Sequence, residues 1–364
     1  MKIEDAAAAR LILERLGVTP QDLIQQRDRA TTLTLNALVP RVSDVVPDPT
    51  RKLLNPYWNK ALRAWPEREA HTITPGDVRW FINHTRETAQ VRKSSRGGHS
   101  AAEHGYHALR CLYRYGIAER IIHPWDDPTS SIDKPLRLAS LRRALDPALV
   151  DDIVDVAATT GHDPELDSLL IRFHLETAAR RGGGLALRLQ DLDTAQSLAL
   201  LREKGNRSRW QPVSPTLMTA LVAHARRRGA EHGNDTVLRY LNGRPVTGRR
   251  YDHLWARLGD YIEPVRTQGI TAHWLRHTTL TWVERAFGYG VARAYAGHGT
   301  ASNNRFGITA TYVKADLYDV ATALATLTRE SHPLAATQAR ALGRVGMATP
   351  PAAPTGLDPA STVA

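Results

Sequence analysis

One stretch of the sequence, PWDDPTSSIDKPLRLAS at residues 124–140, divides the chain into two parts. It combines prolines with turn-forming residues and shows neither helical nor strand periodicity, which is typical of a linker. With 364 residues, the chain is long enough to build a separate hydrophobic core on each side of this stretch. The sequence therefore predicts two domains, with the boundary near residue 140.

Residues 1–45 are predicted to form an N-terminal arm, and residues 46–123 a small helical domain. The arm begins with a short amphipathic helix that ends at Gly17 and continues into a stretch rich in valine and proline. In the next segment helical periodicity recurs three times. Thr74 followed by Pro75 is typical of a helix start, and Gly116 of a helix end.

The second domain is predicted to span residues 141–333 and to be mainly helical with a small antiparallel β-sheet. Ser214 and Pro215 begin one helix, which Gly229 ends. The segment SLALLREKGNRSRWQPVS reads as two strands around a Lys-Gly-Asn turn. The last part of the chain, residues 334–364, is rich in Ala, Pro, Thr and Gly and is predicted to be a disordered tail. Other helices are expected over residues 249–259, 272–286, 290–296 and 309–329.

The net charge of +11, with a pI of about 10.0, favours a polyanionic partner, because cationic side chains release counterions from nucleic acid. An acidic membrane surface is the rival partner. It calls for a basic amphipathic helix with a strongly apolar face, which the sequence lacks, as it lacks roughly 20 consecutive apolar residues. Each basic cluster alone also fits a solvated surface. The candidate DNA contacts are Arg92, Lys93, Arg96, Arg110, Arg114, Arg207, Arg209, Arg249 and Arg250.

The cysteines and histidines of the sequence indicate in which compartment the protein works and whether it binds a metal. Cys111 is the single cysteine and cannot form an internal disulfide, and MKIEDAAAAR lacks the basic start and apolar core of a secretory signal. We therefore expect a cytoplasmic protein, associated with the nucleoid if its partner is DNA. Three histidines, His99, His104 and His107, have no second ligand group nearby, so no metal is expected. The sequence has no Walker motif, and no other cofactor is expected.

Four residues of the second domain suit phosphate chemistry. Arg180 follows a helix and precedes glycines, which let an arginine fork approach a phosphate closely. Lys204 stands at the tip of the predicted hairpin, where an ammonium can protonate a leaving oxygen. His273 and Arg276 lie three residues apart on one helix and share a face. Each pattern taken alone also fits an ordinary helix end, turn or surface helix.

Two further residues complete the set. His298 follows the helix stop at Gly297 in AYAGHG, and Tyr312 stands in TATY at the start of the last long helix. Tyr318 lies nearby, but its neighbours Leu317 and Val320 suggest that it packs that helix. Tyr312 is therefore the better candidate for a nucleophile.

In this order, the motifs resemble those of the phage integrase family of tyrosine recombinases, most closely the integrases of actinobacterial mobile elements. TAARRGGGL is similar to the family pattern T-G-L-R-R-G-E-L, and HWLRHT to H-x-L-R-H-T. The family's hairpin lysine matches the lysine of EKGNRSRWQPVS, AGH is similar to L-G-H, and TATY to T-x-x-Y. The resemblance covers residues 45–333. It implies a helical core-binding domain and a catalytic domain that close a C-shaped clamp around DNA.

The resemblance also implies a reaction and a set of partners. A phosphodiester repels a phenolate unless donors stabilise its oxygens, and a phenol with a pKa of about 10 needs help to ionise. Bond energy kept in a 3′-phosphotyrosine makes ATP and metal unnecessary. The implied partners are double-stranded DNA with inverted half-sites, three further copies in a tetramer on DNA, and an accessory directionality factor, with a monomer or dimer off DNA. The implied catalytic residues are Arg180, Lys204, His273, Arg276, His298 and the nucleophile Tyr312.

The sequence departs from the family pattern at two places, and two other functions stay open. Gly183 stands where many members carry an acidic residue, and the stretch from His298 to Tyr312 is longer than in compact members. A type IB topoisomerase uses the same chemistry but relaxes supercoils as a monomer. A DNA-binding regulator with a decayed catalytic site is the alternative outside the enzymes.

Overall fold

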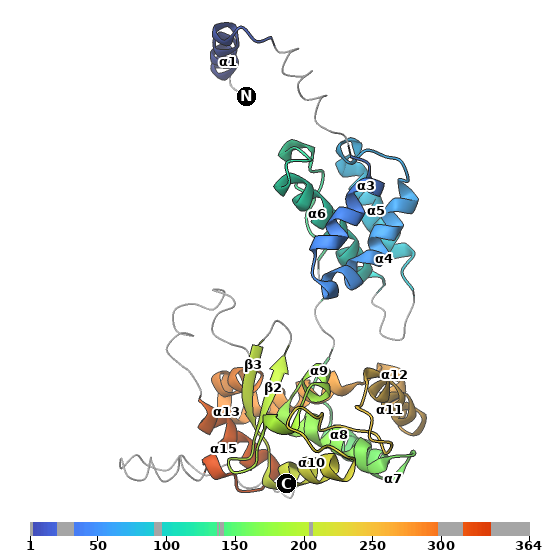
Figure 1. The fold of residues 1–364 in the computed structure, drawn as a ribbon, viewed down its shortest axis with the longest axis vertical. Helices are drawn as coiled ribbons and strands as arrows, with labels where there is room; N and C mark the ends of the chain where they lie inside the picture. The colour runs from blue at the N-terminus through green and yellow to red at the C-terminus, as the bar shows by residue number, and fades with distance from the viewer. Residues whose placement is uncertain are drawn as a thin grey trace, which may run out of the picture. The chain divides into compact units, whose positions relative to one another are not determined.

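The computed structural model describes residues 3–19, 33–90, 97–136, 138, 142–203, 207–297 and 316–335, with the main chain alone at residues 3–7, 203 and 207. The chain divides into two compact units, Met1–Ser140 and Leu141–Ala364, and each contains its own hydrophobic core. Both are built mainly from helices, and the second carries a small antiparallel sheet (Figure 1). The predicted fold class is confirmed.

In the first unit, the helices pack around a core that contains large aromatic side chains. Trp58 and Tyr113 are fully buried, and each donates a hydrogen bond to a backbone carbonyl, Trp58 to Ala108 at 3.0 Å and Tyr113 to Ala70 at 2.7 Å. These bonds satisfy the polar ends of the rings, so burial of the aromatic surface carries no unpaired donor. The elements are α1 (Ile3–Leu16), α3 (Leu35–Val45), α4 (Asp48–Ala64), η1 (Ala70–Thr72), α5 (Pro75–Glu87), α6 (His99–Ala118) and η2 (Pro124–Asp126).

Two parts of the first unit differ from the sequence interpretation. Helix α3 lies within the predicted arm, yet Leu35 and Leu38 are fully buried in the core of this unit. In the predicted linker, Thr129 is fully buried and Ile132 packs against the same core. Both segments carry a few apolar side chains among prolines, and tertiary burial of those side chains outweighs the local composition.

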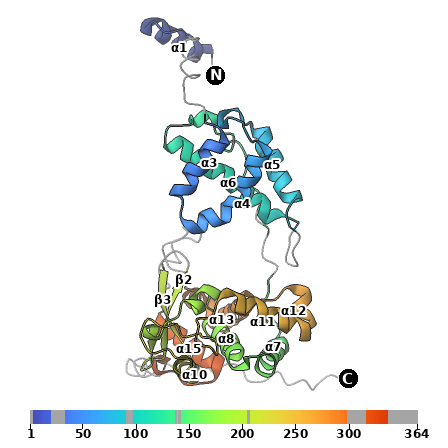
Figure 2. The same ribbon diagram turned by 45° about the vertical axis from the view of Figure 1, so that its right-hand side comes forward.

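In the second unit, α8 (Pro164–Thr177) lies between the sheet on one side and helices α11 and α12 on the other, as Figures 1 and 2 both show. Its N-cap, Asp163, accepts a hydrogen bond from the Leu166 amide, and Phe173 is fully buried. The other helices are α7 (Pro147–Thr159), α9 (Arg181–Leu185), η3 (Leu189–Asp191), α10 (Pro215–Arg227), α11 (Gly248–Tyr261), α12 (Glu263–Gln268), α13 (Ala272–Tyr295) and α15 (Leu317–Thr328).

The sheet has the order β1-β2-β3 and is antiparallel throughout, with β1 (Leu192–Asp193), β2 (Leu198–Glu203) and β3 (Arg207–Pro212). In its register Leu201 lies opposite Arg209, and Leu200 opposite Trp210. The hairpin of β2 and β3 confirms the expected pair of strands. The short strand β1 is absent from the sequence interpretation, since two residues carry no periodic signal.

Helix α13 and the C-terminal segment complete the unit. At Gly288, with φ 83° and ψ 168°, α13 is kinked between the two helices that the sequence predicts separately, because this left-handed φ favours glycine. Helix α15 packs against α13 and β3. After it, Glu330 pairs with Arg172 at 3.1 Å, and His332 hydrogen-bonds the Ser197 carbonyl at 3.1 Å. Residues 316–335 are therefore anchored on the second unit through these contacts.

Candidate active site

Arg180 stands where helix α8 ends and the chain turns. Ala178 adopts a left-handed conformation, with φ 48° and ψ 26°, and caps the helix. For a residue other than glycine this conformation is strained, so it needs tertiary support. Two residues later, the half-buried Arg180 occupies the N-cap position of α9. The glycines that follow it form the short helix α9 instead of ending a helix.

Arg276 supports that turn from helix α13. Its guanidinium donates to the carbonyl of Ala178 and, at 2.7 Å, to the carbonyl of Ala296. The side chain is 4% exposed, so these bonds form in a low-dielectric setting where they are strong. Because Ala296 lies at the C-terminal end of α13, Arg276 ties the approach to Arg180 to the turn that precedes His298.

His273 lies one turn before Arg276 on α13, and its side chain is accessible to solvent although neighbouring groups partly desolvate the ring. Partial burial, followed by the positive charge of Arg142 and then by His277, Arg276 and Arg180, lowers the pKa of His273 to about 4. The neighbouring His277 ring meets it edge-on, with ring centroids 5.0 Å apart. At neutral pH the His273 imidazole is therefore uncharged and able to accept a proton, in an environment that is electropositive.

The fold thus brings three of the six predicted catalytic residues close enough for Arg180 and Arg276 to affect the pKa of His273. The other three, Lys204, His298 and Tyr312, lie outside the described residues. The described chain ends at residue 203, directly before Lys204, and at Gly297, directly before His298, and it resumes at Asp316, four positions after Tyr312. Strands β2 and β3 end on either side of the hairpin turn, Gly297 directly precedes His298, and α15 is capped by Asp316.

Two residues beside the site were missed from the sequence. Arg142 and His277 both act on His273. Arg142 follows the predicted linker, and its segment is held to α13 by a 2.9 Å hydrogen bond from the Leu145 amide to the Thr278 hydroxyl. His277 is part of HWLRHT and could have been found there, one turn after His273. No local pattern marks Arg142.

The replacement of an acidic residue by Gly183 leaves space at this position. A Cβ built on Gly183 would lie 3.8 Å from the Ala179 Cβ and 3.8 Å from the Arg202 carbonyl oxygen, both ordinary contacts. A side chain is therefore sterically tolerated there. The buried carboxylate of Glu176, near the C-terminal end of α8, accepts from Arg172 at 2.7 Å and from the Ser214 amide at 3.0 Å, so it links α8 to the start of α10.

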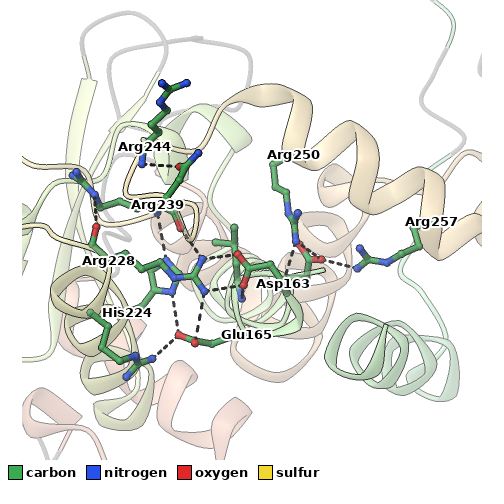
Figure 3. A network of polar contacts seen from close by, with 12 residues as sticks. Asp163, Glu165, His224, Arg228, Arg239, Arg244, Arg250 and Arg257 are labelled. Atoms are coloured by element: carbon green, nitrogen blue, oxygen red, sulfur yellow. Dashed lines mark hydrogen bonds and ion pairs between the residues drawn. The ribbon is translucent and has the colours of Figure 1, made fainter. Parts of the chain in front are cut away.

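Several arginines of the second unit are paired with carboxylates, as Figure 3 shows for the helices α8, α10 and α11. Arg228 forms two hydrogen bonds with the buried Asp163, and Arg250 contacts the fully buried Asp167 at 2.6 Å. Arg202 pairs with Asp191 in the same bidentate way. Arg250 is thus committed to an internal ion pair, unlike the DNA contact expected for it from charge alone.

The remaining candidate DNA contacts fall into three groups. Arg249 is exposed on α11, whereas Arg209 is half-buried on β3 beside the site. Arg110 and Arg114 lie on α6 and line a cavity of about 550 Å³ in the first unit, which Lys134 and Cys111 also line. Arg92, Lys93 and Arg96 lie outside the described residues, as does the side chain of Arg207.

Two kinds of feature are absent from the described part of the chain. It contains no group of three or more His, Cys, Asp or Glu side chains placed to hold a metal ion. None of the helices in those same ranges is long and apolar enough to cross a membrane.

Residues 143–312 match the model described as the phage integrase family. The matched segment contains all six residues predicted to be catalytic. Tyrosine recombinase XerD of Lacticaseibacillus casei is 26% identical over 251 residues, which are 66% of this chain and 81% of that protein. Tyrosine recombinase XerC of Roseiflexus castenholzii is 26% identical over 254 residues, 68% of this chain and 76% of the relative.

Solved structures with a similar fold are also integrases. A lambda integrase dimer bound to a COC′ core site matches with a TM-score of 0.59 at 15% identity, covering 85% of this chain and 86% of that one. The Tn1549 transposon integrase in complex with a circular intermediate DNA matches with a TM-score of 0.56 at 15% identity, covering 74% and 92% of the two chains. At such identities the likeness concerns the fold.

Proposed function

Because this chain belongs to the phage integrase family of tyrosine recombinases, we propose that it cuts and rejoins DNA at specific sites through a 3′-phosphotyrosine on Tyr312. The observation that carries the proposal is the electropositive site itself. Partial burial, then Arg142 and, to a smaller extent, Arg276 and Arg180 lower the pKa of the His273 imidazole, and Arg276 binds the turn that leads to Arg180. A phosphodiester binding there meets the cations that its attack by a phenol requires.

In the proposed reaction, the Tyr312 phenol attacks phosphorus and passes its proton to the neutral His273. Arg180 and Arg276 stabilise the charge that builds on the non-bridging oxygens, with His298 as a further hydrogen-bond donor. The bond from phosphorus to the 5′ oxygen breaks, and Lys204 protonates that oxygen. Attack by the 5′ hydroxyl of another strand on the phosphotyrosine then reverses these steps and reseals the DNA.

The anchoring of α15 supports delivery of Tyr312 from within the same chain. Helix α15 packs against α13, the helix that carries His273 and Arg276. The cap residue Asp316 follows Tyr312 by a short stretch, whose reach is at most ~14 Å even when extended. Glu330 and His332 hold the far end of α15 in place.

The proposed partners follow from the relatives. The solved lambda integrases include a dimer on a core site and a tetramer bound to a Holliday junction. We extend this assembly to the present chain, with two protomers on inverted half-sites and four in the recombining complex. We also propose that the chain moves a mobile element, acts at the nucleoid in the cytoplasm, and takes its direction from an accessory factor.

A nicked suicide duplex tests the function. The DNA flanking the gene should contain a direct repeat, and a duplex with this repeat, nicked near the cleavage point, traps a covalent adduct once the short fragment leaves. Wild-type protein should form an adduct that survives denaturing electrophoresis, while Tyr312→Phe should form none. An adduct with Tyr312→Phe, or none with wild type on any flanking repeat, would contradict the proposal.

The rival topoisomerase activity is separated by the choice of substrate. A site-specific recombinase should leave a supercoiled plasmid without the repeat unrelaxed, and should convert a plasmid carrying two repeats into recombinant products. Relaxation of the plasmid without the repeat, at equal protein concentration, would favour a type IB topoisomerase. Tight binding to the repeat without any strand cleavage would instead favour a DNA-binding regulator.

A further inference from the structure

Three consecutive carbonyls at the C-terminal end of α8 are each bound by a side chain from elsewhere in the second unit. The fully buried Tyr295 donates to the Glu176 carbonyl, Arg209 to the Thr177 carbonyl at 3.4 Å, and Arg276 to the Ala178 carbonyl. The last carbonyls of a helix have no partner within it, and they form the negative end of its dipole. Two arginines and a tyrosine therefore cap the helix that leads to Arg180.

Arg209 also touches the turn that leads to His298. Gly297 has a left-handed φ of +68°, and a Cβ built there would overlap Cδ and Nε of Arg209. The Arg209 side chain thus lies directly against the Gly297 backbone, and only glycine leaves room for it. Its guanidinium also donates to Gln211, which is fully buried, so Gln211 and the Thr177 carbonyl both fix this end of the side chain.

Arg209 belongs to strand β3, which starts just after the turn that carries Lys204. One side chain thereby joins the hairpin, the end of α8 and the turn at Gly297. These three segments carry Lys204, Arg180 and His298. Arg276 makes a parallel link between the end of α8 and Ala296.

We infer that Arg209 is a positioning residue, which sets the hairpin and the His298 turn in register with Arg180. This inference rests on the proposed function, and it replaces the DNA contact that the charge of Arg209 suggests. A positioning role predicts a defect in the chemical step at unchanged DNA affinity. A DNA contact predicts the opposite, weaker binding with normal cleavage once the protein saturates the site.

The first test separates binding from cleavage on the nicked duplex. Arg209→Met should keep the dissociation constant within about twofold, yet slow adduct formation at saturating protein by about 100-fold, the effect of misplacing a catalytic group by about 1 Å. Arg209→Lys should recover part of the rate. Arg266→Met, which removes an exposed arginine of α12 far along the chain from these segments, serves as the matched control and should leave both quantities unchanged.

Two results of this test bear on different claims. Cleavage by Arg209→Met at the wild-type rate, with weakened binding and a smaller salt dependence, overturns the positioning role and restores Arg209 as a DNA contact. If wild-type protein forms no adduct, the proposed function fails instead.

A thermodynamic cycle tests the contact without any DNA. Gly297→Ala should lower the melting temperature, both because of its φ and because the new methyl group meets Arg209. In an Arg209→Ala background the same change should lower the melting temperature less, since the obstacle is gone. Equal effects in the two backgrounds would overturn the inference, whether or not the protein cleaves DNA.

Discussion

Two clusters of arginines in the second unit differ in what holds them. In the network of Figure 3, Arg228 and Arg250 pair with the buried carboxylates of Asp163 and Asp167. At the candidate site, Arg276 instead donates to the backbone carbonyls of Ala178 and Ala296. A carboxylate neutralises an arginine, whereas a carbonyl only orients it. At the site, burial and then the positive charge of neighbouring arginines lower the pKa of His273, whereas the arginines of the network are paired with carboxylates inside the fold.

The strongest test of this difference removes a carboxylate from the network. Asp167 is fully buried and accepts from Arg250 at 2.8 Å and Arg257 at 2.6 Å. Asp167→Asn leaves two poorly hydrated cations facing each other, so the free energy of unfolding should fall by about 3–5 kcal/mol in urea denaturation. Adduct formation should persist at low temperature, where the protein stays folded. Loss of cleavage in a folded Asp167→Asn protein would show that the network takes part in the reaction, which contradicts a purely structural role.

The matching change at the site is Arg276→Lys. A lysine keeps the charge but lacks the planar fork that reaches both carbonyls, so adduct formation should fall by about 10²- to 10³-fold. Arg228→Lys in the network is the matched control, and it should lower the melting temperature with little effect on the rate in the folded protein. The comparison breaks if Arg276→Lys cleaves normally, or if the two variants show the same pattern.

The pH dependence sharpens the electrostatic side of the comparison. Deprotonated His273 is the form that accepts the Tyr312 proton, and its pKa is lowered from 6.5 to about 4. Activity that needs this form should therefore persist as pH falls through 6.5 and decline only toward pH 4. An NMR titration of the free protein should place the His273 midpoint well below 6.5. Arg142→Ala removes one of the causes and should raise that midpoint, and a midpoint at 6.5 in wild type would contradict the account.

The smallest expected effect concerns two adjacent arginines of α11. Arg249 is exposed, whereas Arg250 is bound to Asp167. If Arg249 contacts a phosphate, Arg249→Ala should make the slope of log K against log salt less negative by about 0.9, without changing the melting temperature. Arg250→Ala should instead lower the melting temperature and leave this slope unchanged, because Arg250 is paired with Asp167. Fluorescence anisotropy at several salt concentrations measures the slopes, and equal slopes for Arg249→Ala and wild type would remove Arg249 from the DNA interface.

Local signals in the sequence predicted elements whose ends depend on local chemistry. Ser214 and Pro215 begin α10, and the Ser214 hydroxyl accepts from the Leu217 amide. The break between the two helices predicted around Gly288 is the kink in α13. By contrast, Tyr318 was expected to pack its helix and is 39% exposed, because the neighbouring Val320 fills the buried face.

Tertiary pairing was the part that the sequence could not supply. Nothing in the local sequence distinguishes Arg202, Arg228 and Arg250 from an arginine that faces DNA. Their partners Asp191, Asp163 and Asp167 lie 11 to 83 positions away, so no periodicity links them. The position of Arg142 beside His273 depends in the same way on contacts of a segment with no regular structure. The catalytic motifs, by contrast, could be recognised in the sequence, because each is a short continuous segment and they follow one another in a fixed order.

The identity of the nucleophile is the central claim, and the most direct measurement is to map the residue that carries the DNA. The wild-type adduct would be trapped on the nicked duplex, digested with a nuclease and a protease, and sequenced by tandem mass spectrometry. The account predicts a nucleotide remnant on Tyr312, within the segment TATYVK. A remnant on the exposed Tyr318, or on any other residue, would contradict it.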